Sequence, residues 1–181
     1  MQENAVKHSI LLAAKDLTDT KIRRTQTAML YDQLPQGLAA TVFNSSLMAW
    51  TLSAVIPATQ LILWMSVIVG ICVARYATFK RFQRENCDVF DDVKWRKIFK
   101  VSATAAAIAW GAAGFIFFPE SSPQHQAFIG FVLAGMAAGA SSSMAADDRI
   151  YRIYLFIVIL PYLVQLLLDG SQFNMAMAAM G

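Results

Sequence analysis

The sequence predicts an all-α protein: a polytopic bundle of membrane-spanning helices that follows a polar N-terminal helix. Of its 181 residues, 57% are hydrophobic and only 15% are charged, whereas soluble domains average about 45–50% apolar residues. Asp, Glu, Lys and Arg are absent from four long runs, residues 33–74, 101–119, 121–146 and 153–168. A charge-free apolar run of about 18 residues or more can cross a bilayer as a helix.

The first 34 residues are predicted to form a cytoplasmic helix of their own. Charges occupy the positions where a signal peptide would carry its apolar core, so no such peptide is expected. Apolar residues share one face of the expected helix over residues 4–30: Val6, Ile10, Ala13 and Leu17. We therefore expect an amphipathic helix that lies on the inner leaflet or pairs with a second copy of itself.

The remaining residues, 35–181, are predicted to form one transmembrane bundle. The run at 33–74 is twice the length of a span and carries Pro57 near its middle, so it divides into spans 37–56 and 59–75. Three more spans are expected at 100–118, 126–146 and 150–168. The residues from 171 onward suit only the start of a sixth span, because 12 helical residues reach about 18 Å across a core of about 30 Å. The printed chain is thus expected to stop inside an element.

The basic residues predict the orientation. Five Lys and Arg residues precede the first span, eight lie between the second and third, and two lie between the fourth and fifth, which accounts for all 15. Because short cytoplasmic loops carry the Lys and Arg excess, we expect the N-terminus in the cytoplasm. Residues 76–99 then form a cytoplasmic basic helical hairpin. Basic residues beside span ends favour lipid headgroups over nucleic acid as the partner.

Small residues predict how the helices pack. Membrane helices associate by close van der Waals contact, which requires small side chains on one face. Spacings of four residues place such side chains on shared faces of spans 100–118 and 126–146, so these two spans are expected to form the close-packed centre. The alternative is that the small residues leave room for a ligand. The positions assigned to helix packing are Gly111, Gly114, Gly130, Gly135, Gly139 and Ser143.

Five residues are candidates for sensing. Trp110 could wall a small pocket in the bundle. Glu120 and His125 share an outer loop, where a histidine could sense pH or a ligand because it titrates near neutrality, although a solvated turn set by Pro119 and Pro123 is the favoured interpretation. Pro161 removes one backbone hydrogen bond and could act as a hinge or only kink its helix. Gln165 either bonds across helices or faces the interface.

No motif for catalysis, cofactor binding or metal binding is predicted. Cys72 and Cys87 lack the spacing of metal ligands and are interpreted as free thiols. A serine hydrolase at Ser141 would need a nearby histidine, but His8 and His125 lie far from it in the expected topology. The chain by itself is therefore not expected to be an enzyme.

Several segments resemble a known family in their order and spacing. They are "LYDQLPQGL" (30–38), "WRKIF" (95–99), "AWGAAGFIFFP" (109–119), "HQAFIGFVLAGMAAGASSS" (125–143) and "LPYLVQLLL" (160–168). Together they resemble the N-terminal six-helix membrane input region of bacterial sensor histidine kinases and GGDEF diguanylate cyclases. The resemblance implies a sensor in the bacterial inner membrane whose sixth helix leads into a cytoplasmic output domain. The chain contains neither a "GGDEF" sequence nor a kinase nucleotide-binding motif, and the resemblance implies no ligand residues.

The function expected is therefore that of a membrane signal-input domain, working as a homodimer, with a small apolar ligand as one option for the stimulus. The alternatives are a stand-alone membrane scaffold that binds partner proteins and, with less support, a passive transporter. Ion-coupled transport is disfavoured because the predicted spans contain no Asp or Glu, and their only Lys or Arg residues, Arg75, Lys100 and Arg152, lie at or near span ends.

Overall fold

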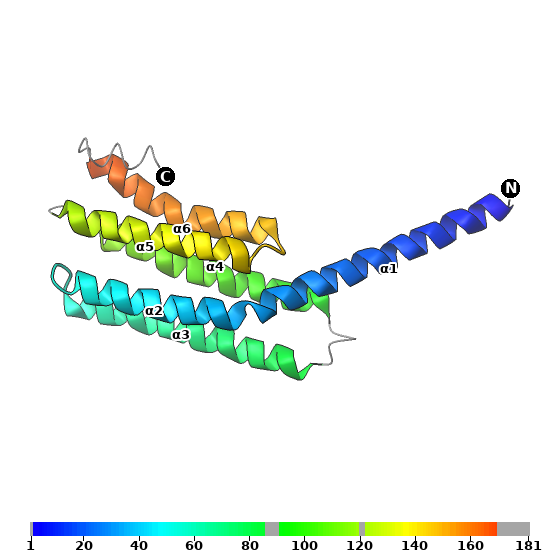
Figure 1. Cartoon of the computed structure of the whole chain (residues 1–181), viewed down its shortest axis with the longest axis horizontal. Coiled ribbons are helices and arrows are strands. Elements are labelled where there is room, and N and C mark those ends of the chain that lie inside the picture. The colour runs from blue at the N-terminus through cyan, green and yellow to red at the C-terminus, as the bar shows by residue number, and fades with distance from the viewer. Residues whose placement is uncertain (1, 86–90, 120–121, 170–181) are drawn as a thin grey trace.

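The computed structural model describes residues 2–85, 91–119 and 122–169, with side chains from Lys15 onward except Asp16. This part of the chain is helical throughout, apart from short turns. Figure 1 shows α1 projecting from one end of a bundle that the other helices form. The helices are α1 (Gln2–Asp32), α2 (Leu34–Leu52), α3 (Ala58–Arg84), α4 (Asp92–Ile116), α5 (Pro123–Ser143) and α6 (Asp148–Asp169).

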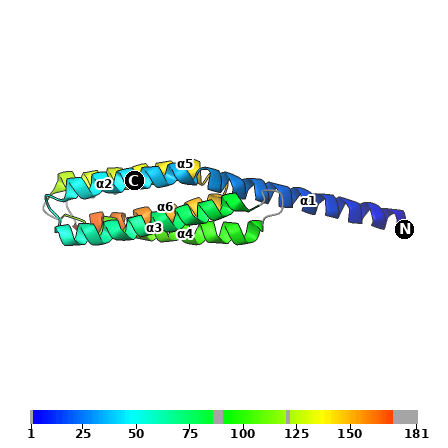
Figure 2. The same cartoon turned by 90° about the horizontal axis from the view of Figure 1, so that it is seen from below.

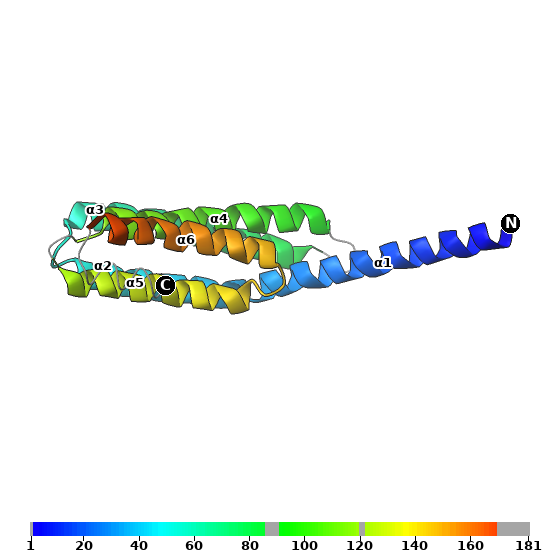
Figure 3. The same ribbon diagram turned by 90° about the horizontal axis from the view of Figure 1, so that it is seen from above.

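The bundle has two layers. Figures 2 and 3 place α2 and α5 in one layer and α3, α4 and α6 in the other, with all five roughly parallel or antiparallel. The helices α3 and α5 end, and α4 and α6 begin, at the end of the bundle from which α1 projects (Figure 1), and the Lys and Arg residues of the described chain fall toward this end in the sequence. We call this the basic end of the bundle.

Four helices, α3, α4, α5 and α6, are long and apolar enough to cross a membrane. The sequence predicts five full spans, and α2, which corresponds to the first of them, is not among the four. Its 19 residues contain no charged side chain. Its mean hydropathy is lowered by several polar side chains within it: Gln36, Asn44, Ser45 and Ser46.

Large apolar side chains cover much of the outside of the bundle. Phe131 of α5 and Phe156 of α6 are 80% and 67% exposed, and Leu63 of α3 is 70% exposed. Soluble monomers seldom expose contiguous apolar patches of more than a few hundred Å². An outward apolar surface on helices of this length suits contact with lipid.

The N-terminal helix runs to Asp32, and only Gln33 separates it from α2. Pro35 causes the break, because it has no N–H to donate to the Tyr31 carbonyl and so interrupts the helical bonding. Leu17, one of the expected apolar-face residues, is 67% exposed. The side chains of the other three, at positions 6, 10 and 13, lie outside the described residues.

The helices α3 and α4 extend beyond the spans predicted for them. The predicted spans end at 75 and begin at 100, whereas α3 continues to Arg84 and α4 begins at Asp92. The hairpin expected at 76–99 therefore consists of continuations of two spans rather than of separate helices. Asp91 caps α4 by accepting a hydrogen bond from the Lys94 backbone N–H at 3.1 Å. Cys87 and the partial span expected from 171 lie outside the described residues.

The closest packing differs from the expectation. Spans 100–118 and 126–146 were predicted to form the centre, but α4 packs most extensively against α6. A Cβ on Gly111 of α4 would collide with the Ile157 carbonyl oxygen of α6 and lie 3.3 Å from Pro161 Cγ. Pro161 has no N–H, so the Ile157 carbonyl lacks its usual helical donor. Gly111 lets the α4 backbone approach that carbonyl, a geometry that suits weak Cα–H···O contacts between helices.

Candidate functional site

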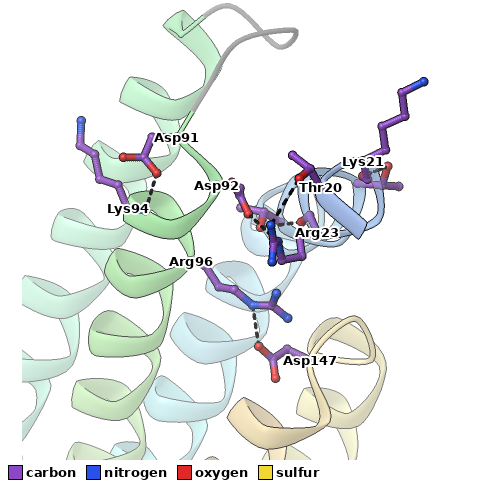
Figure 4. Close-up of polar contacts among 10 residues, drawn as sticks. Thr20, Lys21, Arg23, Asp91, Asp92, Lys94, Arg96 and Asp147 are labelled. Atoms are coloured by element: carbon purple, nitrogen blue, oxygen red, sulfur yellow. Dashed lines mark hydrogen bonds and ion pairs between the residues drawn. The ribbon is translucent and has the colours of Figure 1, made fainter. Parts of the chain in front are cut away.

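Ion pairs join α1, α4 and the turn before α6 at the basic end (Figure 4). Arg23 of α1 lies 3.5 Å from Asp92, the first residue of α4. Arg96 of α4 lies 2.8 Å from the carboxylate of Asp147, which directly precedes α6. Asp147 also accepts a hydrogen bond from the Arg149 backbone N–H at 3.1 Å, as suits an acid before a helix N-terminus.

An aromatic cluster of Tyr31, Phe82, Trp95 and Phe99 fixes the end of α1 to α3 and α4. The Tyr31 ring stacks on Phe82 with centroids 4.2 Å apart and meets Trp95 edge-on at 5.6 Å. The Tyr31 hydroxyl donates a hydrogen bond to the Trp95 carbonyl at 3.1 Å. Burial raises the pKa of the Tyr31 phenol, so the phenol stays neutral and remains a donor. Trp95 in turn donates its indole N–H to Glu85.

A pocket of about 160 Å³ lies beside this cluster, between the two layers of the bundle. Its lining comes mainly from the first half of α2 and the second half of α5, with one residue each from α3 and α6 and two from α4. Asn44 of α2 donates a hydrogen bond to Met136 Sδ of α5 at 3.2 Å and links the two sides. We call it the basic-end pocket.

Arg75 of α3 lines the basic-end pocket and is the only Lys or Arg that does so among the described residues. Its Nε is buried and has no hydrogen-bond partner. Its guanidinium carbon lies 5.5 Å from the centroid of the Phe99 ring, at a distance typical of a cation–π contact. The groups that interact with it electrostatically are Tyr154, Cys72 and Tyr31, which are neutral at pH 7 in their ordinary state.

No carboxylate of the described residues forms an ion pair with Arg75. The residues that line the basic-end pocket likewise include no Asp or Glu. A partly buried cation without a carboxylate partner among the described residues is therefore the main electrostatic feature of this site. Among the described residues, no cluster of three or more His, Cys, Asp or Glu side chains could hold a metal ion.

The glycines assigned to packing divide into two groups. A Cβ on Gly111, Gly114 or Gly130 would meet α6, with Tyr162 the neighbour of Gly114 at 3.2 Å and of Gly130 at 2.7 Å. At Gly135 and Gly139, nothing lies within 4 Å of where a Cβ would sit. These two glycines, with Ser143, instead line the basic-end pocket. No helix of the described chain packs against these two glycines, so the packing role assigned to them stays a prediction.

The sensing candidates lie apart from this pocket. Trp110 is fully buried, meets Trp64 edge-on at 5.4 Å, and its indole N–H has no partner. Gln165 of α6 donates a hydrogen bond to the Phe115 carbonyl of α4 at 3.0 Å, so of its two predicted roles it bonds across helices. His125 Nδ1 lies 2.6 Å from the Ser122 hydroxyl in the first turn of α5.

Glu120 lies outside the described residues. Pro161, which the sequence leaves open as a hinge or a kink, lies inside α6 against Gly111 of α4. None of the four sensing candidates that the structure describes lines the basic-end pocket.

Arg75 is the residue that sequence reasoning missed. The prediction ended a span at this residue and counted it with the cytoplasmic loop, so its side chain was not considered as part of the bundle. The helix α3 continues for nine residues beyond it, so Arg75 lies within the helix rather than at its end, which the charge pattern alone did not indicate. An ionisable residue within a span is a functional candidate by default.

Comparison with known protein families, with curated proteins and with solved structures finds no match to this chain. The arrangement just described is what characterises the protein: an all-helical chain with four helices able to span a membrane and a long N-terminal helix outside that set.

Proposed function

We propose that this chain is a membrane signal-input domain of a bacterial signalling protein of the histidine kinase or diguanylate cyclase type. In this proposal it lies in the inner membrane with its N-terminus in the cytoplasm, since every basic residue falls on one side. The sequence resemblance and the four candidate spans support it. We assign α2 as a fifth span, because it carries no charged residue and runs beside α3 (Figures 1 and 2).

The observation that carries the proposal is the junction between α1 and the bundle. Tyr31 packs against Phe82 of α3 and bonds to Trp95 of α4, so the end of α1 contacts two helices at once. A small shift of α3 against α4 would therefore change the direction in which α1 leaves the bundle. Packed interfaces tend to switch between discrete arrangements rather than deform continuously, which suits the relay of a signal.

The working form in this proposal is a homodimer. Apolar side chains remain exposed along the part of α1 that leaves the bundle, with Ile22 51% exposed and Leu17 67% exposed. A second α1 could cover them, as helices with apolar faces pair in coiled coils. The proposal assigns binding and relay to this chain and no catalysis.

A chimera tests the proposal. Residues 1–169 would replace the first five spans of a membrane-bound diguanylate cyclase that keeps its own sixth helix and output domain, and cellular cyclic-di-GMP would be measured. We expect Tyr31→Ala, which removes the junction contacts, to change the nucleotide level several-fold. The matched control is Tyr76→Ala, since Tyr76 is 49% exposed on α3 and lies outside the junction. Equal nucleotide levels in both variants at equal protein abundance would contradict the proposal.

A further inference from the structure

We propose that the basic-end pocket binds a phosphate group, which Arg75 recognises. The phosphate could belong to a phospholipid headgroup or to a soluble phosphate compound. The inference rests on the membrane placement proposed above, and it names the ligand class of that input domain. It does not depend on signalling, because ligand binding can be measured on the purified chain.

The charge of Arg75 is the first step. Transfer of an ion into a low-dielectric interior carries a penalty of several kcal/mol unless an opposite charge or hydrogen bonds compensate for it. Here the cation has one aromatic ring beside it, neutral titratable neighbours and no carboxylate partner among the described residues. A bound anion would supply both the missing charge and an acceptor for the buried Nε, which has no partner.

The chemistry of the pocket lining is the second step. Besides Arg75 its lining carries neutral polar side chains from three segments: Gln33 before α2, Asn44 in α2, and Ser142 and Ser143 at the end of α5. The two serine hydroxyls donate to the Gly139 and Ala140 carbonyls in this structure. The lining contains no Asp or Glu. One cation among neutral polar side chains, with no acid, favours an anion over a cation.

The size and position of the pocket are the third step. Its volume of about 160 Å³ is far above the roughly 10–15 Å³ that a single water requires, so it admits a phosphate group and part of the molecule that carries it. It lies at the basic end, which is the level of the anionic headgroups in the proposed topology. The planar guanidinium fork matches the oxygens of a phosphate in a bidentate manner.

The glycines Gly135 and Gly139 provide access. With no atom within 4 Å of a Cβ at either position, they leave open space on the α5 side of the pocket. A larger side chain at Gly139 would therefore fill the pocket without displacing another helix. This gives a variant that blocks the site and keeps Arg75 intact.

The test uses the full chain purified in dodecyl maltoside, a detergent without phosphate. Native mass spectrometry would measure binding of phosphatidylglycerol, with a diacylglycerol of the same acyl chains as the probe that lacks phosphate. Equilibrium dialysis would measure binding of labelled inorganic phosphate. The variants are Arg75→Gln, Arg75→Lys and Gly139→Leu, with Arg81→Gln as the matched control, since Arg81 is an exposed residue of the same helix that does not line the pocket.

The wild-type chain should bind a phosphate-bearing probe at least about tenfold more tightly than Arg75→Gln or Gly139→Leu, as expected for loss of a charge-assisted contact. Arg81→Gln should bind as the wild type does, and Arg75→Lys should fall between. Tight binding of phosphatidylglycerol but not of inorganic phosphate would identify the lipid as the source, and the reverse would identify a soluble compound. Equal binding by wild type and Gly139→Leu would overturn the proposal, even if Arg75→Gln fails to fold.

Discussion

A single methyl group added at Gly111 should loosen the contact between α4 and α6. In the wild-type chain, the α4 backbone lies directly against the Ile157 carbonyl that Pro161 leaves without a helical donor. A Cβ at position 111 would overlap that carbonyl oxygen. Because the obstacle is backbone, it cannot rotate away as a flexible side chain would, and the two helices must separate.

The expected loss of stability in Gly111→Ala is estimated by comparison with the Gly70→Ala variant. Gly70 lies within α3, and nothing lies within 4 Å of where its Cβ would be. Both substitutions gain the same helix propensity, about 1 kcal/mol, so that term cancels in the difference. Overpacking costs about 1–3 kcal/mol, and we expect Gly111→Ala to be less stable than Gly70→Ala by about 2 kcal/mol. This corresponds to a ratio of about 30 between their unfolding constants.

The assay is unfolding of both variants in mixed micelles of dodecyl maltoside and sodium dodecyl sulfate, followed by tryptophan fluorescence. Trp110 is fully buried next to the substituted residue and Trp64 packs against it, so their emission should report the separation of the helices. A Gly111→Ala chain that is as stable as the Gly70→Ala chain would refute the reasoning about the α4–α6 contact.

Two hydrogen bonds give further predictions. Tyr31→Phe keeps the stacking on Phe82 but removes the hydrogen bond to the Trp95 carbonyl. The free energy of unfolding, measured in the same assay, should therefore fall by about 1 kcal/mol. An unchanged value would show that the hydroxyl contributes nothing to the junction. Gln165→Leu removes the hydrogen bond that Gln165 of α6 donates to the Phe115 carbonyl of α4. The free energy of unfolding should fall by about 0.6 kcal/mol, a typical value for such bonds in membranes. A loss of several kcal/mol would contradict the view that this bond is supplementary.

The positions of the helices were largely predictable from the sequence, because lipid-length apolar runs and prolines mark them. The expected span 126–146 corresponds to α5 at Pro123–Ser143, and 150–168 corresponds to α6 at Asp148–Asp169. The extensions of α3 and α4 were not predicted as parts of the spans, because a charged residue signals the end of lipid contact and not the end of a helix. Charge placement therefore indicated the basic end but not where the helices stop.

The choice of helix partners could not be predicted. Small residues occur on several helices, and their spacing does not say which neighbour they face. Gly111 faces α6 because Pro161 has freed a carbonyl there, a pairing between residues 50 positions apart in the sequence. Gly135 and Gly139 have the same four-residue spacing as a packing motif, yet they face open space beside the basic-end pocket.

The candidate site could not be predicted because it depends on the direction in which the Arg75 side chain points. Arg75 contributes to the count of basic residues whichever way it points, so the sequence alone does not separate a headgroup anchor from an interior cation. The fold decides this by placing Phe99 of α4 and Tyr154 of α6 around it.

Cysteine labelling across the membrane tests most directly whether the chain spans a bilayer with its basic end inside. Single cysteines at exposed positions would be introduced in a chain whose Cys72 and Cys87 are replaced by alanine, expressed in a bacterial host and treated with an impermeant maleimide. We predict that Gln124→Cys, at the α5 start, is labelled in intact cells, and that Lys80→Cys, near the end of α3, is labelled only after the membrane is opened. Labelling of both positions from the same side, or loss of the protein to the soluble fraction, would contradict this account.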